Sequence, residues 1–153
     1  MKLPVYLTLL AESEQTLGRS FRQVAEAHAD EPDVRSLCET LAAQCDAHES
    51  RLRPVIGRFG AGAADDEPER LHADALGEPR TGPLGLLRDL QDLYLLANLA
   101  DITWTMVKQA AQALADHELL DVVTACEKET AVQVQWLKTR MKQAAPQALI
   151  AAV

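Results

Sequence analysis

Apolar residues recur at helical spacing in four segments, and the lengths of the connections between them constrain the fold most strongly. The segments cover about residues 3–29, 33–57, 83–115 and 118–144. Two connections are short turns, which make neighbouring helices antiparallel, whereas residues 58–82 are long enough to run the length of a helix bundle. The pattern predicts a single all-α domain over 1–153, in which two helical hairpins are joined by a crossover.

The two predicted hairpins resemble each other in sequence. The segment at 7–12 reads LTLLAE and recurs at 93–98 as LYLLAN, while DVRSLCE at 33–39 recurs at 121–127 as DVVTACE. An internal repeat of two helices is typical of a bundle with pseudo-twofold symmetry. Glycines mark the end of the second helix in this interpretation, at Gly57 and Gly60.

Charge and cysteine content narrow the classes of function. The chain has a formal net charge of -8 and no long basic run, so we expect no nucleic-acid partner. The densest apolar run, at 93–100, is far shorter than the roughly 20 residues that a membrane span needs. No signal peptide is evident, and Cys38 and Cys45 lie two helical turns apart, too far for a disulfide. We therefore expect a soluble, cytoplasmic protein with no membrane contact.

Polar residues that fall within the apolar face of a helix are the candidates for chemistry. Stepping by seven residues along each helix identifies such residues, with at least one from every helix. They are Glu14, Cys45, His48, Asp101, Cys126 and Glu129. A carboxylate buried without a partner is costly, so inward acids on three helices indicate a shared cation or a hydrogen-bonded network.

Distance from the turns predicts which of these residues meet. Glu14 and His48 lie equally far from the first turn, so they should face each other across an antiparallel pair. Asp101 and Glu129 differ by about one helical turn in their distance from the second turn. In the repeat, His48 corresponds to Trp136, which cannot bind metal, so the second hairpin supplies the less complete half of the site.

The topology and these positions resemble the ferritin-like superfamily, in particular its rubrerythrin-like and small bacterial stress-protein branches. Such bundles hold a di-iron or di-manganese centre with one Glu from helices one and three and a Glu-x-x-His from helices two and four. The resemblance implies Glu14 as the first carboxylate and Asp101 as a shortened third-helix ligand. Cys45-x-x-His48 and Cys126-x-x-Glu129 would replace the two Glu-x-x-His motifs, so that cysteines stand where bridging glutamates are expected.

Two functions follow from this resemblance. The first is a stress-related metal-binding protein with Glu14, His48, Asp101 and Glu129 as ligands and the two cysteines as weaker candidates. Imidazole with carboxylates suits iron, manganese or zinc, and with iron an oxidoreductase acting on oxygen, peroxide or ferrous iron would be the expected class. The rival is a metal-free bundle that serves as a dimeric scaffold or interaction protein. A redox-sensing thiol at Cys45 or Cys126 is a third interpretation.

Each candidate residue also has an ordinary structural interpretation. His48 could be a core histidine bonded to Glu14, the cysteines could be small buried apolar groups, and Asp101 and Glu129 could lie on an exposed flank. The remaining histidines, His28, His72 and His117, lie at helix ends or in the long connection, where we expect them to be solvated. Trp104 is a core residue whose indole N–H needs a partner.

A homodimer is the expected oligomeric state. Leu95 and Ile102 fall on the otherwise polar side of the third helix and leave apolar area that one bundle does not cover. We therefore predict a subunit contact on the outer face of residues 83–115.

Overall fold

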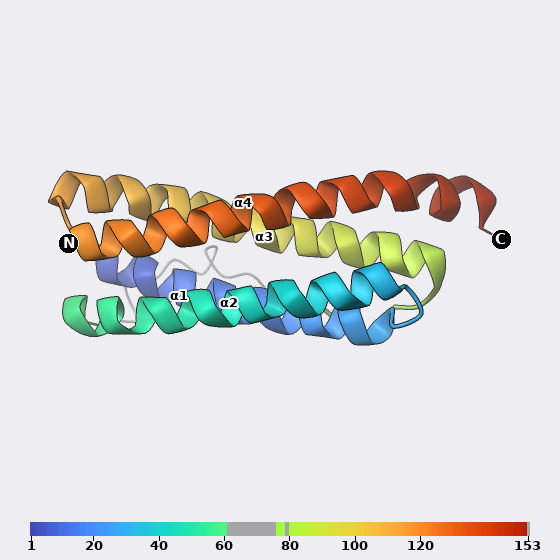
Figure 1. Cartoon of the computed structure of the whole chain (residues 1–153), viewed down its shortest axis with the longest axis horizontal. Helices are drawn as coiled ribbons and strands as arrows, with labels where there is room; N and C mark the ends of the chain where they lie inside the picture. Colours follow the sequence, from blue (N-terminus) through green and yellow to red (C-terminus); the bar gives the residue numbers. More distant parts are fainter. Residues whose placement is uncertain (61–75, 79, 153) are drawn as a thin grey trace.

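The computed structural model describes residues 1–60, 76–78 and 80–152 of the chain. Four long helices form a bundle and a short π-helix extends the last of them (Figure 1). They are α1 (Leu3–Ala27), α2 (Pro32–Phe59), α3 (Gly82–Leu114), α4 (His117–Pro146) and η3 (Gln147–Ala151). The described residues contain no strand, so the prediction of an all-α bundle is confirmed.

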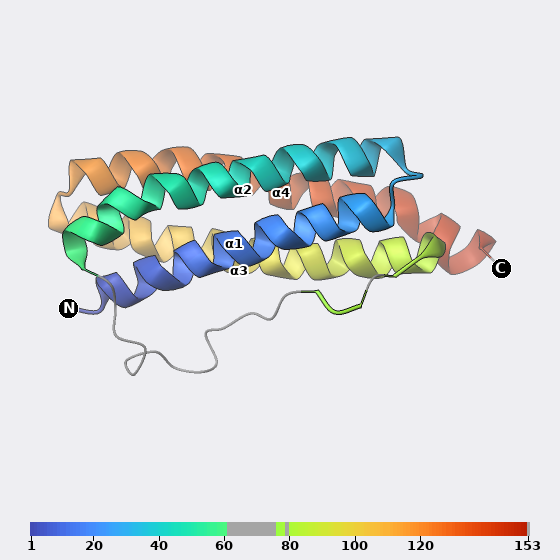
Figure 2. The same cartoon turned by 90° about the horizontal axis from the view of Figure 1, so that it is seen from below.

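Neighbouring helices in the bundle run antiparallel. The most extensive contacts are those of α1 with α2 and of α3 with α4, while α1 also packs against α3 and α4 against α2. The end of α2 and the beginning of α3 lie at opposite ends of the bundle (Figure 2). The predicted crossover at 58–82 lies largely outside the described residues, and its first two positions belong to α2.

Local sequence explains where the helices begin and end. Pro32 opens α2, at a position where the absence of an N–H costs nothing. Asp116 caps α4, because its carboxylate accepts the backbone N–H of Leu119 at 3.0 Å. The predicted stop at Gly57 was wrong, since α2 continues through it to Phe59 and only Gly60, with φ of 83°, terminates the helix.

A single hydrophobic core draws on all four long helices. Phe21 and Trp104 are its largest fully buried side chains. The expectation that His28 is solvated was wrong, because its ring is buried and its Nε2 lies 2.8 Å from Asp89 Oδ2. His117 is exposed, and His72 lies outside the described residues.

A helix that crosses a membrane needs about 20 consecutive, predominantly apolar residues. Within 1–60, 76–78 and 80–152, no helix is long and apolar enough to cross a membrane.

Candidate functional site

One side chain from each long helix converges in the core. They are Glu14 of α1, His48 of α2, Trp104 of α3 and Glu129 of α4. His48 Nδ1 lies 3.2 Å from Glu14 Oε1, and His48 Nε2 lies 3.1 Å from Glu129 Oε1. The imidazole therefore stands between two carboxylates, of which Glu14 is fully buried and Glu129 has a side chain that is 43% exposed.

Trp104 completes the surroundings of Glu14. Its indole Nε1–H donates to Glu14 Oε1 at 2.8 Å. The indole also packs edge-to-face on the His48 ring, with centroids 5.9 Å apart and an interplanar angle of 86°. Glu14 Oε1 is thus shared by a neutral N–H donor and an imidazole nitrogen. We refer to Glu14, His48, Trp104 and Glu129 as the buried cluster.

The protonation of His48 follows from its two neighbours. A carboxylate only accepts hydrogen bonds, so the contact with Glu129 places a proton on Nε2. Burial acts to lower the pKa of His48, but the carboxylates of Glu14 and then Glu129 act in the opposite direction and raise the pKa above its ordinary value. The cluster thus favours an imidazolium ion held between two acids.

Two buried polar atoms of the cluster have no hydrogen-bond partner. His48 Nδ1 is within ion-pair distance of Glu14 Oε1, but the two are not aligned for a hydrogen bond, and Nδ1 has no other hydrogen-bond partner. Glu14 Oε2 is likewise buried without a partner. Each unpaired buried polar group costs on the order of 1–3 kcal/mol, so these two atoms need explanation.

The structure places Asp101 apart from these contacts. Asp101 is half-buried on α3 beside Glu127, which pairs with Lys108 at 3.0 Å. Burial, and then the charge of Glu127, raise the pKa of Asp101 above its ordinary value. The ferritin-like resemblance implied Asp101 as the third-helix ligand, whereas the α3 residue that contacts Glu14 is Trp104.

Both candidate cysteines are buried and neither is a reactive thiol. Burial raises the pKa of Cys126 to about 12, and burial followed by the charge of Glu14 raises the pKa of Cys45. Both side chains are therefore neutral thiols near pH 7, which are poor nucleophiles. Next to Cys45, Gln133 Nε2 lies 4.0 Å from the sulfur and donates to Gln44 Oε1 at 3.0 Å.

Sequence reasoning missed the roles of Trp104 and Gln133. Both are fully buried, and both carry polar atoms that need partners. The need of the indole N–H for an acceptor was a usable signal, because Glu14 was the inward acid on the first helix. Gln133 offered a weaker signal, since it lies seven residues after Cys126 and therefore on the same face of α4.

The donor set does not fit a di-metal centre. The di-metal centre that the ferritin-like resemblance implies uses two bridging carboxylates, but buried thiols stand at the corresponding positions and Trp104 donates to Glu14. Within the described part of the chain, no group of three or more His, Cys, Asp or Glu side chains has an arrangement that could hold a metal ion.

Comparison with known proteins adds no evidence on function to that of the buried cluster. No protein-family model, no curated protein and no solved structure matches the chain.

Proposed function

We propose that this chain is a metal-free bundle of ferritin-like topology that acts through its surface as a scaffold or interaction protein. The observation that carries the proposal is the position of His48, whose two ring nitrogens each face a carboxylate oxygen, at 3.2 and 3.1 Å. The hydrogen bond to Glu129 places a proton on Nε2, which then has no lone pair for a metal. A raised pKa favours the form of His48 in which both nitrogens carry protons.

Trp104 supports the same conclusion from the third helix. Where the ferritin-like resemblance expects a metal-binding carboxylate, an indole occupies the core and donates to Glu14 at 2.8 Å. This hydrogen bond stabilises the buried carboxylate of Glu14, as a bound cation would, but without any ion. Neutral thiols in place of bridging glutamates remove the remaining ligands of a di-metal centre.

A second candidate function, binding of a single divalent cation, is favoured by the two unpaired atoms of the cluster. Glu14 Oε2 and His48 Nδ1 are buried without hydrogen-bond partners. If Nε2 alone carries the proton, Glu129 orients the ring and Nδ1 has a lone pair for iron, manganese or zinc. Such an ion would supply Lewis-acid or redox chemistry when bound, while Glu14 and His48 would hold it.

Elemental analysis separates the two functions. The parent chain, purified without chelators and then loaded with Fe²⁺, Mn²⁺ or Zn²⁺ and desalted, is expected to retain far less than one equivalent of metal. Glu14→Gln and His48→Gln should give the same result. The matched control is Glu12→Gln, an exposed acid on the same helix.

Stoichiometric metal in the parent and in Glu12→Gln, lost in both Glu14→Gln and His48→Gln, would reject the metal-free proposal. That result would establish the second candidate instead. Metal retained equally by all four proteins would indicate surface binding unrelated to the buried cluster.

A further inference from the structure

The outer face of α3 lacks charge over most of its length. After Arg88, the exposed positions on this helix carry no acidic or basic side chain. They are Gln91, Leu95, Ile102, Met106, Gln109, Gln112, Ala113 and Leu114. By contrast, the exposed positions of α2 include Asp33, Arg35, Glu39 and Arg53. In a chain with 25% charged residues, an uncharged helix face is unusual.

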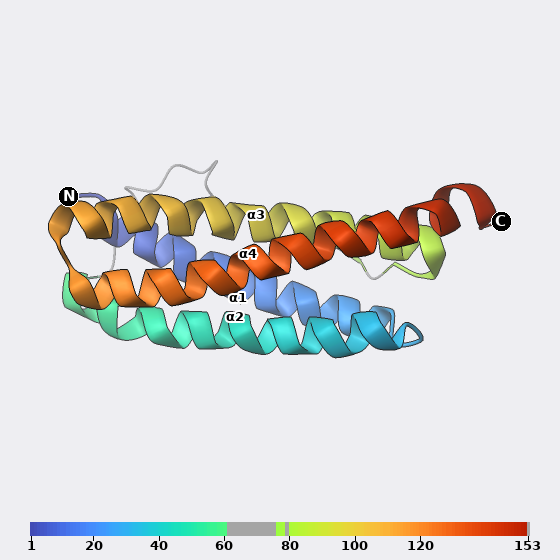
Figure 3. The same cartoon turned by 45° about the horizontal axis from the view of Figure 1, so that its top comes forward.

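Large apolar side chains lie at the centre of this face. Leu95 is 62% exposed and Ile102 is 52% exposed. They lie seven residues apart and therefore on the same side of the helix, and Met106 continues the line toward the end of α3. We call Leu95, Ile102 and Met106 the α3 stripe. Figure 3 shows α3 at the edge of the bundle, with its outer side uncovered by the other helices.

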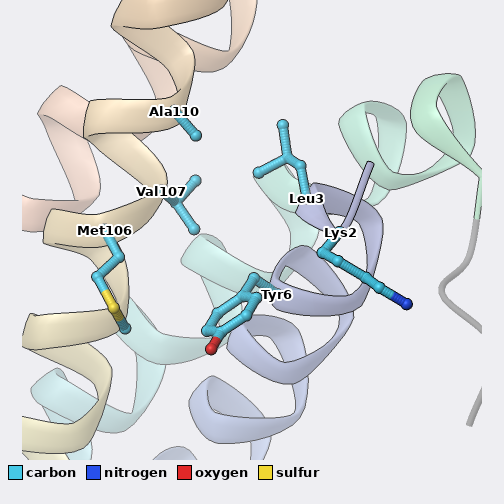
Figure 4. Close-up of a pocket in the computed structure, with 6 residues that line it drawn as sticks. All are labelled: Lys2, Leu3, Tyr6, Met106, Val107 and Ala110. Atoms are coloured by element: carbon cyan, nitrogen blue, oxygen red, sulfur yellow. The ribbon is translucent and has the colours of Figure 1, made fainter. Parts of the chain in front are cut away.

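An apolar pocket of about 270 Å³ adjoins the stripe at Met106. Leu3 and Tyr6 of α1 form one wall together with Lys2, and Met106, Val107 and Ala110 of α3 form the other (Figure 4). The stripe is therefore continuous with a concavity large enough to receive an apolar side chain.

We propose that the α3 stripe is a self-association surface and that its occupant is the same stripe of a second copy of this chain. This inference rests on the proposed function, because it names the partner of an interaction protein. A net charge of -8 on each copy opposes association, and this repulsion is weakest where the facing surfaces carry no charge. A twofold contact brings a surface against itself, and an uncharged apolar stripe is complementary to itself.

The uncharged face supplies about half the area of a standard interface. From Gln91 to Leu114 the helix extends about 35 Å, and a helix with side chains is about 10–12 Å wide. The footprint is therefore on the order of 400 Å², about half of the ~800 Å² per partner in interfaces of standard size. The pocket wall on α1, including Tyr6, adds to that area.

Sedimentation equilibrium on the full chain tests the proposal. The parent, whose chain mass is 16.7 kDa, is expected to sediment at twice that mass at about 100 μM, well above a dissociation constant in the ~1 μM range. Leu95→Glu and Ile102→Glu, made singly, should each raise the dissociation constant by about 30-fold or more, because each buries a charge in an apolar contact. Leu95→Ala should weaken the dimer less.

Val132→Glu is the matched control. Val132 is an apolar residue of α4 that is also 62% exposed, so this variant adds the same charge to an equally accessible position off the stripe. The dimer should persist. Circular dichroism should report equal helicity in all variants, and if either Glu variant loses helicity, Leu95→Ser and Ile102→Ser replace it.

Three results would overturn the proposal. They are a monomeric parent at about 100 μM, a dimer that Leu95→Glu and Ile102→Glu leave intact, and equal disruption by Val132→Glu. A monomeric parent would assign the stripe to a different occupant. The metal content of the same samples separates the two proposals. A monomer without metal would overturn only the proposed dimer, whereas a dimer that contains metal would overturn only the proposed metal-free function.

Discussion

At the scale of single residues, the most informative feature is the raised pKa of His48. The ring has no exposed surface, yet the carboxylates of Glu14 and Glu129 hold its pKa above the ordinary value. The protonated form is stabilised only in the folded chain, where the two acids flank it. The stability of the protein should therefore depend on pH through this one side chain.

We predict that the free energy of unfolding falls as pH rises above about 6.5, the ordinary pKa of histidine. A group whose folded pKa is raised contributes stability fully below its unfolded pKa and loses it as pH rises through the folded pKa. Urea unfolding of the parent and of His48→Gln between about pH 6 and pH 9 measures the effect. The decrease in the free energy of unfolding with pH should be smaller in His48→Gln than in the parent. It should be unchanged in His117→Gln, which alters an exposed histidine. Equal slopes in the parent and His48→Gln would contradict an imidazolium in the core.

At the scale of elements, close approach between α1 and α2 depends on Gly18. A Cβ atom at this position would lie 3.2 Å from Cys45 Cβ and 3.4 Å from Asp46 Oδ1. Cys45 Cβ is attached directly to the backbone of α2, so it cannot move without displacing the helix. Gly57 in α2 has the opposite surroundings, since a Cβ there would meet no atom within 4 Å.

The two glycines should respond differently to replacement by alanine. Gly57→Ala is expected to stabilise the protein by about 0.5–1 kcal/mol, because alanine loses less backbone entropy in a helix. Gly18→Ala gains the same propensity but must separate α1 from α2, so its free energy of unfolding should be lower than that of Gly57→Ala by about 1 kcal/mol or more. Urea denaturation of both variants measures the difference. If they are equally stabilised, the contact between α1 and α2 is looser than these distances indicate.

At the scale of the whole molecule, a polar network connects α3 to the rest of the chain near the beginning of that helix. Arg80 donates to Asp89 and to Asp92 at 2.7 Å each, and Asp89 also contacts buried His28 of α1. Nearby, Gln23 Nε2 donates to the carbonyl oxygen of Gly77 at 2.7 Å. The described residues that precede α3 are thus tied to both hairpins by side chains far apart in sequence.

Removing the arginine should destabilise the whole bundle. Arg80→Ala leaves Asp89 buried with His28 as its remaining partner, and we expect a loss of about 1–2 kcal/mol. This is the lower part of the range for bonds between charged groups, because the Arg80 side chain is 35% exposed. Arg88→Ala, at an exposed position of α3, is the control and should change the free energy of unfolding by less than about 0.5 kcal/mol. Similar losses in both variants would show that the network adds nothing specific.

The periodicity of apolar residues determined the helical class of this protein and the side of each helix that is buried. The residues that a helix buries recur at a fixed spacing within that helix. A seven-residue step therefore locates inward residues such as Glu14 and His48 without knowledge of their partners. The same step identified Leu95 and Ile102 as outward-facing, and both are exposed. The end of α2 was misplaced at Gly57 because an isolated glycine costs a helix only about 1 kcal/mol, which packing offsets.

The distance from the first turn predicted that Glu14 and His48 meet, but only the tertiary structure decided which side chains meet between the two hairpins. Trp104 and Glu14 are 90 positions apart, and His28 and Asp89 are 61 apart, so no local pattern relates either pair. Their contacts depend on how the second hairpin is shifted and rotated against the first. That arrangement results from the packing of the entire core, in which a displacement of one helical turn, about 5.4 Å, would replace every cross-helix partner while preserving each helix's apolar face. For this reason the sequence indicated Glu14, His48, Trp104 and Glu129 as inward residues, whereas the fold decided that the indole and the second carboxylate lie beside the Glu14–His48 pair.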